Sequence, residues 1–339
     1  AGTNGKGSSV ALAGALLRDA DELVGAYTSP HVRRYNERIA VDNVPASDDE
    51  IIAAFERVDA VRDGLPLTYF EFGTLAALVV FADRGVTRLV LEVGMGGRLD
   101  AVNAIDPDAS LITNISLDHC DWLGDDVETI GREKAGIMRS SRPTVFASHD
   151  IPRSVLDTAA SVGAELLVAG RDYDWRQGDG NWQWRGGRIS LEGLTPPALS
   201  GDVQFGNAAG VLALLEAAGF DDCLERDRVN RALGALRVEG RMQRVERERQ
   251  WLLDVAHNPA AAEALAAALA SGGGNRKTIA IVGMRDDKDV EGLVAALAES
   301  IDTWIGVPLD DARSHDVREL ARRVANASGR ACLEAANLH

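Results

Sequence analysis

The stretch Gly2-Thr3-Asn4-Gly5-Lys6-Gly7-Ser8 opens the chain and predicts a phosphate-binding loop. Its glycines allow successive backbone amides to point toward phosphate oxygens, while Lys6 adds a positive charge. The hydroxyl of Ser8 can reach a metal ion or a phosphate. An extra glycine separates Lys6 from Ser8, so the stretch departs from the common G-x-x-x-x-G-K-[ST] pattern. A glycine-rich turn without a ligand is the alternative interpretation of this stretch taken alone.

The two ends of the sequence lack elements that the pattern calls for. A phosphate loop normally follows a buried strand, and no strand precedes Gly2. The final residues, 335–339, contain no obvious closing element. We therefore expect the chain to be a fragment.

Downstream of the loop, apolar runs alternate with segments of helical periodicity. Buried strands are predicted at residues 88–93, 109–115 and 143–147, and helices at 9–17, 70–82 and 128–138. Strands separated by helices indicate a parallel, doubly wound sheet. The sequence therefore predicts an α/β fold whose first domain, residues 1–240, has a P-loop-type, mostly parallel sheet.

The sequence pattern changes twice after this region. Between residues 172 and 191, tryptophans alternate with polar residues between glycines, which predicts a small antiparallel hairpin insert. Helices are predicted at 207–218 and 227–236, and a hinge at 239–241. From residue 250 strands and helices alternate again, with a Ser-Gly-Gly-Gly linker at 271–274. We predict a second, smaller Rossmann-like α/β domain over residues 246–339.

Composition excludes several classes of function. Hydrophobic residues at 46% and charged residues at 26% are typical of globular proteins. A net charge of −16 opposes binding to nucleic acid or to an anionic membrane surface. The three cysteines are too few and too far apart for a disulfide framework or a zinc site. We expect a cytoplasmic monomer whose partners are small molecules.

Further motifs follow the loop in a fixed order. They are Thr28-Ser29-Pro30-His31 with Asn36-Glu37-Arg38-Ile39, Tyr69-Phe70-Glu71-Phe72-Gly73-Thr74, Leu91-Glu92-Val93-Gly94-Met95-Gly96-Gly97-Arg98-Leu99-Asp100, Leu117-Asp118-His119, Arg132-Glu133-Lys134-Ala135-Gly136-Ile137 and Leu253-Asp254-Val255-Ala256-His257-Asn258-Pro259. In order and spacing, from Gly2 to about Pro308, the chain resembles the dihydrofolate synthase/folylpolyglutamate synthase branch of the Mur ligase superfamily.

This resemblance implies an ADP-forming ligase. Such an enzyme uses ATP to add L-glutamate to 7,8-dihydropteroate and to tetrahydrofolate polyglutamates. The acceptor carboxylate attacks the γ-phosphate to give an acyl phosphate, which the glutamate amine then displaces. A Mur-type cell-wall peptide ligase and a non-catalytic nucleotide-binding protein are the alternatives.

The resemblance also implies two Mg²⁺ ions. Glu92 ends a predicted buried strand and is followed by glycines, so its carboxylate can face a crevice at the strand end. By resemblance, Ser29 and Glu92 ligate the first Mg²⁺, and Glu92 and His119 the second. A surface charge for Glu92 and a hydrogen-bonded structural role for His119 are the alternatives.

Three side chains are implied to be catalytic: Lys6, His119 and Lys134. The lysine that matches Lys134 is carbamylated in the enzymes that the chain resembles, which would convert a cation into an anion. From the sequence alone, an exposed lysine in an ion pair is the alternative.

The resemblance assigns the nucleotide site to both domains. The implied ATP-binding residues are Thr3, Asn4, Gly5, Lys6, Gly7, Ser8, Asn207, Arg241, Asp254 and His257. Met242 departs from the phenylalanine that the family usually has after the arginine. The change is conservative in size and polarity.

The implied dihydropteroate-binding residues form two groups. They are Thr68, Tyr69, Phe70 and Glu71, and Leu99, Asp100 and Ala101. An aromatic ring can stack on a pterin, and a carboxylate can accept hydrogen bonds from its amino and ring N–H groups. Core packing of Phe70 and helix capping by Asp100 are the alternatives.

Overall fold

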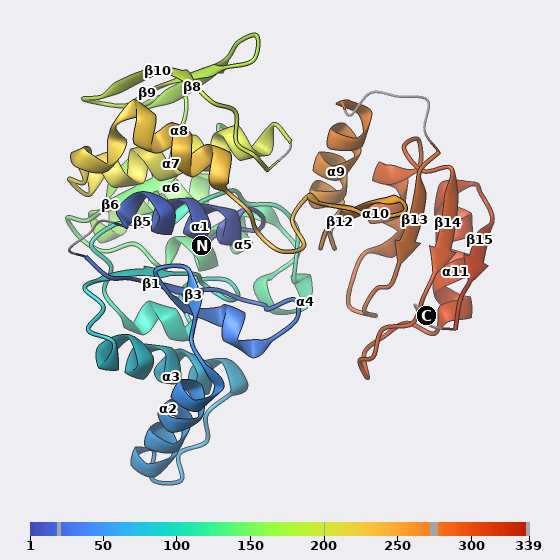
Figure 1. Ribbon diagram of the computed structural model, residues 1–339, viewed down its shortest axis with the longest axis horizontal. Helices are drawn as coiled ribbons and strands as arrows, with labels where there is room; N and C mark the ends of the chain where they lie inside the picture. The colour runs from blue at the N-terminus through green and yellow to red at the C-terminus, as the bar shows by residue number, and fades with distance from the viewer. Residues whose placement is uncertain (19–21, 200, 272–276, 337–339) are drawn as a thin grey trace. The chain divides into compact units, whose positions relative to one another are not determined.

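The computed structural model describes residues 1–18, 22–199, 201–271 and 277–336 (Figure 1). The chain divides into two compact units. Unit 1 contains Ala1–Ile115, Leu123–Leu199 and Val203–Glu239, and unit 2 contains Ser116–Trp122, Ser200–Asp202 and Gly240–His339. Most of the linker predicted at 271–274 lies outside the described residues.

One sheet of unit 1 has the strand order β3-β2-β1-β4. Its strands are β1 (Val24–Tyr27), β2 (Ile39–Val41), β3 (Val44–Pro45) and β4 (Arg88–Leu91). β1 and β4 are parallel, whereas β2 pairs antiparallel with both β1 and β3. The antiparallel part was not predicted. Asp42 and Asn43 form the β2–β3 turn with φ angles of 51° and 66°, the left-handed conformation that Asp and Asn tolerate in two-residue hairpins.

Two helices pack together beside this sheet, α2 (Asp48–Val61) and α3 (Tyr69–Asp83) (Figure 1). Both begin at a capping box. The Ser47 hydroxyl accepts the Glu50 N–H and the Thr68 hydroxyl accepts the Glu71 N–H, while each glutamate accepts the backbone N–H of its capping residue. The helix predicted at 70–82 is confirmed, and the predicted strand at 88–93 is confirmed in the shorter form of β4.

A second sheet of unit 1 is fully parallel and has the order β5-β6-β7. Its strands are β5 (Ser110–Ile112), β6 (Pro143–Phe146) and β7 (Glu165–Val168), and unit 1 also contains the helices α1 (Lys6–Leu17), α5 (Val127–Ala135), α6 (Arg153–Val162) and α7 (Val203–Ala217). α7 lies against β5, β6 and α1, and its residues Ala209, Val211 and Leu212 are fully buried. This helix is the centre of the main hydrophobic core of unit 1.

The predicted hairpin insert is an antiparallel sheet of three strands (Figure 1, top). The strands are β8 (Asp174–Gln177), β9 (Trp182–Arg185) and β10 (Ser190–Leu194), and helix α8 (Arg226–Ala235) lies against β10. Trp182 and Trp184 are 0% and 1% exposed, whereas the residues between and after them face solvent. The alternation that predicted the hairpin therefore reflects one buried face. The third strand, β10, was not predicted.

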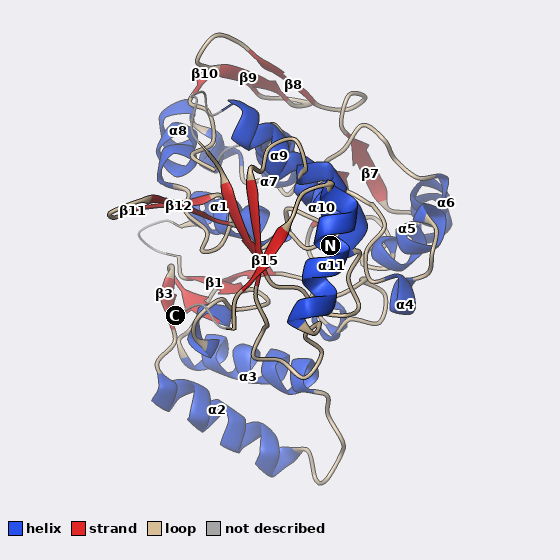
Figure 2. Ribbon diagram, turned by 90° about the vertical axis from the view of Figure 1, so that its right-hand side faces the viewer, coloured by secondary structure: helices blue, strands red, loops and turns tan. Residues whose placement is uncertain are grey.

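Unit 2 is built around a parallel sheet with the order β13-β14-β15 (Figure 2). Its strands are β13 (Ile279–Val282), β14 (Thr303–Gly306) and β15 (Cys332–Glu334), its helices are α9 (Pro259–Ser271), α10 (Val290–Leu297) and α11 (Val317–Ser328), and a separate antiparallel ribbon joins β11 (Gln243–Glu246) to β12 (Gln250–Leu253). Trp304 of β14, 1% exposed, belongs to the core of this unit.

Short elements complete the described chain. They are α4 (Cys120–Leu123) and the 3₁₀ helices η1 (Tyr35–Arg38), η2 (Ala101–Ala104) and η3 (Asp221–Leu224). The three cysteines are free. Among the described residues, no helix combines the length and apolar character that crossing a membrane requires. The predicted α/β fold class, with a small antiparallel sheet and a second α/β unit, is confirmed.

Leu16 tests the core beneath the phosphate loop. It is 0% exposed in α1, and we expect Leu16→Ala to lower the free energy of unfolding of unit 1 by about 2–5 kcal/mol, because it leaves a cavity. Leu65→Ala is the matched control, since Leu65 is 65% exposed. Urea unfolding followed by far-UV circular dichroism measures both variants. Equal losses in the two variants would contradict this account of the core.

Candidate active site

The glycine-rich stretch forms a tight loop that leads directly into α1. The helix starts at Lys6, three residues before the predicted start, because Gly5 takes a left-handed conformation with φ of 87°. The loop is fastened to the segment after β5. The N–H of Thr3 donates to the Asn114 carbonyl (2.9 Å), and the Thr113 hydroxyl donates to the Asn4 carbonyl (2.6 Å). The N-terminus of α1 is thereby held beside the carboxyl end of a parallel strand, where anions are commonly bound.

Two positions of the loop require glycine. A Cβ atom added at Gly2 would lie 1.8 Å from the Thr113 hydroxyl oxygen. A Cβ at Gly5 would lie 2.5 Å from the Asn207 side-chain oxygen. Asn207 therefore packs directly on the loop, and the structure brings together these two predicted nucleotide-binding positions.

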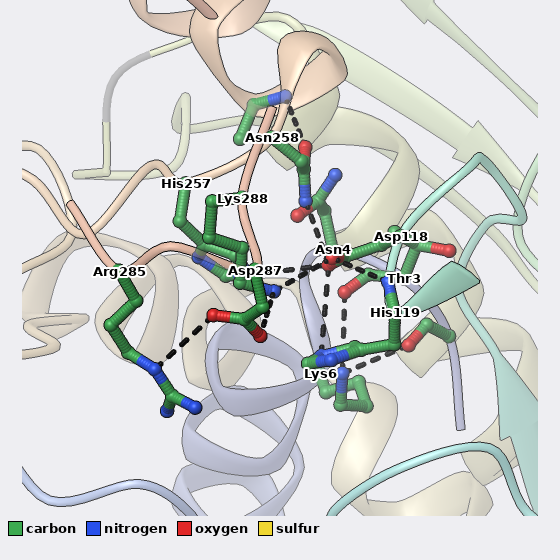
Figure 3. Close-up of polar contacts among 12 residues, drawn as sticks. Thr3, Asn4, Lys6, Asp118, His119, His257, Asn258, Arg285, Asp287 and Lys288 are labelled. Atoms are coloured by element: carbon green, nitrogen blue, oxygen red, sulfur yellow. Dashed lines mark hydrogen bonds and ion pairs between the residues drawn. The ribbon is translucent and has the colours of Figure 1, made fainter. Parts of the chain in front are cut away.

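The Lys6 side chain folds back over its own loop. Its Nζ donates to the carbonyl oxygens of Gly2 and Thr3, at 2.9 and 3.2 Å (Figure 3). These contacts keep an ammonium group beside the loop amides. Positive charge and N–H donors together favour a phosphate group at this position.

Glu92 and Ser29 lie at the ends of two neighbouring parallel strands. Tyr27 of β1 is paired with Leu91 of β4, so the residues that follow each strand meet at the same sheet edge. The Ser29 N–H donates to Glu92 Oε2 at 3.1 Å. Glu92 is 5% exposed, so the alternative of a surface charge is wrong.

The same carboxylate also approaches the phosphate loop. A Cβ built on Gly7 would be 3.7 Å from Glu92 Oε2, which places the carboxylate in contact distance of the first turn of α1. A buried carboxylate and a neighbouring serine residue can provide the oxygen ligands that Mg²⁺ prefers. The donor set present here therefore fits the predicted divalent cation.

Lys134 lies on α5 and is 4% exposed. The alternative of an exposed lysine in a surface ion pair is therefore wrong. The carbonyl oxygens of Glu133 and Lys134 would lie 2.9 Å from a Cβ on Gly97, so the end of α5 packs closely on the glycine turn after β4. This packing holds the Lys134 amine out of water.

The first group of predicted acceptor residues forms the start of α3. Thr68 is its N-cap, and the Glu71 carboxylate accepts the Thr68 N–H at 2.7 Å. Phe70 is half-buried, with its ring centroid 5.8 Å from that of Tyr27, and a Cβ at Gly94 would lie 2.7 Å from its ring. Tyr69 is 64% exposed.

The second group follows the glycine turn. Leu99 is exposed, and Ala101 begins η2. Asp100 caps η2, with its carboxylate accepting the N–H groups of Val102 and Met95, both at 3.0 Å. Burial raises the pKa of Asp100, although these hydrogen bonds oppose the shift. Capping is therefore one role of this carboxylate.

In unit 2, a single carboxylate gathers four donors. Asp118 accepts the His119 N–H (2.8 Å), Lys288 Nζ (3.0 Å), Asn258 Nδ2 (3.0 Å) and a contact from His257 Nε2 (3.2 Å) (Figure 3). Burial alone would raise the pKa of Asp118, but the His257 hydrogen bond and the charges of His119, His257 and Lys288 lower it overall.

Sequence reasoning missed Asp118 and Lys288 as members of this cluster. The side chain of Lys288 is 10% exposed and that of Asp118 is 7% exposed. Asp118 stood beside His119 in the Leu-Asp-His motif but was given no role of its own, and Lys288 was given none. The ligand atoms of Asp118, His119 and His257 lie within 4.8 Å of one another, so these three could hold a metal ion.

The remaining predicted residues of unit 2 surround the predicted hinge. Asp254 accepts the N–H groups of Met242 and Ala256, at 2.9 and 2.8 Å. Met242 has a φ angle of 46°, and Arg241 is partly exposed. His257 Nδ1 lies 2.9 Å from the Val255 carbonyl oxygen, which fixes the ring orientation. Asp254 therefore shapes the backbone in this region.

The chain matches two family models. Residues 1–174 match the Mur ligase middle domain, and residues 240–338 match the Mur ligase, glutamate ligase domain. The dihydrofolate synthase/folylpolyglutamate synthase of Escherichia coli strain K12 is 37% identical over 326 residues, which cover 96% of this chain and 76% of that protein.

Solved structures agree with these matches. E. coli FolC in complex with DHPP and ADP has a TM-score of 0.92 and 36% identity, over 99% of this chain and 79% of that one. A bifunctional folylpolyglutamate synthase/dihydrofolate synthase with Mn, AMPPNP and L-glutamate bound has a TM-score of 0.90 and 39% identity, over 100% of this chain and 80% of that one.

Gly5 and Gly64 form a matched pair that tests the loop. Both have positive φ angles, 87° and 74°, but only the added Cβ at Gly5 meets neighbouring atoms, those of Asn207. We expect Gly64→Ala to cost about 1–2 kcal/mol of stability from backbone strain alone. Gly5→Ala should cost more and should also weaken ADP binding. Urea unfolding and titration calorimetry measure both effects, and unchanged ADP affinity in Gly5→Ala would contradict the assignment.

Proposed function

Because the chain belongs to the Mur ligase family, as a dihydrofolate synthase/folylpolyglutamate synthase, we propose that its substrates are 7,8-dihydropteroate and tetrahydrofolate polyglutamates. It is an ATP-dependent, ADP-forming ligase that joins L-glutamate to these acceptors through an amide bond. ATP and a divalent metal ion take part in this reaction.

The observation that carries the proposal is the position of Glu92. Its buried carboxylate contacts the Ser29 N–H on one side and lies next to Gly7 of the phosphate loop on the other. A carboxylate beside a phosphate-binding loop would repel ATP unless a cation lay between them. The position of the Glu92 carboxylate beside the phosphate loop therefore supports a site that binds a metal ion together with a nucleotide.

Lys6 and the loop amides bind the terminal phosphates in this proposal. The loop from Thr3 to Ser8 supplies N–H donors, and Asn207 holds the loop from the opposite side. In unit 2, Arg241, Asp254 and His257 contribute to nucleotide binding, an assignment that rests on the family resemblance. Catalysis by such a site is mainly positioning and charge neutralisation.

Two Mg²⁺ ions belong to the proposal. Ser29 and Glu92 hold the first, and Glu92 and His119 hold the second. The first assignment is supported by the Ser29–Glu92 contact, and the second by the family resemblance. When bound, the ions neutralise the phosphate charge and the charge that develops during transfer.

The reaction has two steps. A carboxylate oxygen of the acceptor bonds to the γ-phosphorus as the bond to the β–γ bridging oxygen breaks, and ADP leaves. The glutamate nitrogen then bonds to the acyl carbon, the bond from that carbon to the phosphate oxygen breaks, and nitrogen loses a proton.

Phe70 and Asp100 hold the pterin through the ring face and the carboxylate, with Thr68, Tyr69, Glu71, Leu99 and Ala101 around them.

Lys134 is proposed to be carbamylated. Its 4% exposure supplies the water-excluded setting that the modification needs. The carbamate replaces a positive charge with a negative one beside the glycine turn that leads from Glu92 to Asp100. It would then orient metal-bound groups together with His119.

The enzyme is further proposed to act as a cytoplasmic monomer without nucleic-acid or membrane partners. Its net charge of −16 supports the absence of polyanionic partners.

Glu92→Gln tests the metal–nucleotide site. We expect amide formation to fall by at least about 10²-fold, since loss of a single charge-stabilising group in an active site costs about that much. Mn²⁺ binding, measured by calorimetry in the presence of ADP, should weaken in parallel. Glu56→Gln, at an exposed position of α2, is the control. Normal product formation by Glu92→Gln would overturn the proposal, as would normal formation by Lys6→Ala.

Lys134 variants test the carbamate. Lys134→Ala should lose ligase activity, and added acetate should restore part of it because a small carboxylate can take the place of the carbamate anion. Lys134→Arg should stay inactive, since it keeps the positive charge. Activity is followed as ADP release that depends on dihydropteroate. Full activity of Lys134→Arg would show that a cation suffices and would contradict carbamylation.

A further inference from the structure

Arg38 is a buried cation, and its contacts within the described part of the chain include no acidic side chain. It ends η1 in unit 1 and is 8% exposed. Its Nε donates to His31 Nδ1 at 2.8 Å, and its guanidinium carbon lies 5.5 Å from the ring centroids of both Tyr35 and Tyr69. Among the described residues, no carboxylate lies within ion-pair distance of this guanidinium.

The nearest acids along the chain are already engaged. The Glu37 carboxylate accepts the backbone N–H groups of Val32, Arg33 and Arg34, at 2.6 to 2.8 Å. Asp48 is paired with Arg34 at 2.9 Å. Aromatic faces offset only part of the desolvation cost of a buried cation, since each is worth about 0.5–2 kcal/mol whereas burial costs several. The site therefore favours an anion that the described chain does not supply.

The position of Arg38 indicates which anion this is. Its carbonyl oxygen accepts the Thr28 N–H at 2.9 Å, so the residue lies next to the start of the Ser29 segment. Its guanidinium lies by Tyr69, which precedes Phe70 at the start of α3. Arg38 thus lies between the end of β1 that leads to Ser29 and the proposed acceptor-binding residues at the start of α3. Tyr69, beside the guanidinium, is 64% exposed.

We propose that Arg38 binds the carboxylate of the dihydropteroate acceptor and selects acceptors that carry this charge. This inference rests on the proposed function. A guanidinium presents N–H donors in a planar fork that matches a carboxylate, and its contact with the two rings orients the fork. Held by one or both of its oxygens, the carboxylate keeps lone pairs for attack on phosphorus. The binding step breaks no bond and transfers no proton.

The role of Arg38 is tested by comparing the affinities of a charged and an uncharged ligand, without measuring turnover. Dihydropteroate and its carboxamide analogue, which differ in that one charge, are titrated against the wild-type chain and its variants, and binding is followed by calorimetry. The wild type should prefer the carboxylate by about 10- to 100-fold, the range of a charge-assisted hydrogen bond. Arg38→Met should remove this preference by weakening carboxylate binding alone, and Arg38→Lys should retain part of it.

Arg57→Met is the matched control, because Arg57 is an exposed arginine paired with Asp83 on the neighbouring helices. It should bind both ligands as the wild type does. Equal weakening of both ligands in Arg38→Met would assign Arg38 to packing of the aromatic rings and overturn the inference. An absent carboxylate preference in the wild type would also overturn it, even if Arg38→Met failed to fold. Product formation by the wild type, measured separately, tells failure of this inference from failure of the proposed function.

Discussion

A buried carboxylate at the end of a parallel strand is the constraint on which the rest of unit 1 depends. Glu92 is 5% exposed, and an ionised group in that position destabilises the fold unless nearby donors or cations offset its desolvation. The Ser29 N–H is one such donor, and it is available because β1 and β4 run parallel in register. Gly7 leaves the carboxylate accessible from the helix side. The register of β1 with β4 and the absence of a side chain at Gly7 therefore together position the Glu92 carboxylate.

Several basic side chains are largely removed from solvent, although the chain as a whole carries a net negative charge. It carries 36 basic residues against 52 acidic ones, yet Lys134 and Arg38 are 4% and 8% exposed and the side chain of Lys288 is 10% exposed. Coulomb interactions at contact distance in a low-dielectric interior outweigh the screened field of distant surface charges. A net charge of −16 is thus compatible with binding phosphate and carboxylate groups. The net negative charge opposes polyanions, while Lys6 and Arg38 are proposed to bind small anions.

Features that depend on local sequence were predictable, and those that depend on distant contacts were not. The loop at Gly5, the helix predicted at 70–82, most of the strand predicted at 88–93 and the alternative of capping by Asp100 follow from neighbouring residues. The β2–β3 turn carried a local signal, Asp42-Asn43 between two valines, from which no hairpin was predicted.

The cluster around Asp118 shows why the rest of the site could not be predicted from the sequence. Its contacts to His257 and Lys288 span 139 and 170 residues of the chain. No periodicity or spacing encodes a contact of that length, because it depends on how whole elements pack. The burial of Lys134 has the same origin, since helix α5 offers several faces and packing selects one. The catalytic and binding roles of these residues stay predictions.

Structural and functional interpretations of a side chain need not compete in this site. Asp100 caps η2, but a carboxylate has about four acceptor positions, so its backbone N–H donors still leave room for a ligand. Phe70 packs on Tyr27 and Gly94 and remains half-buried, so part of its ring stays accessible. The structural contacts fix the orientation that recognition requires, and the entropy of ordering these groups is lost on folding rather than on binding. Capping and packing are thus compatible with the proposed binding roles of Asp100 and Phe70.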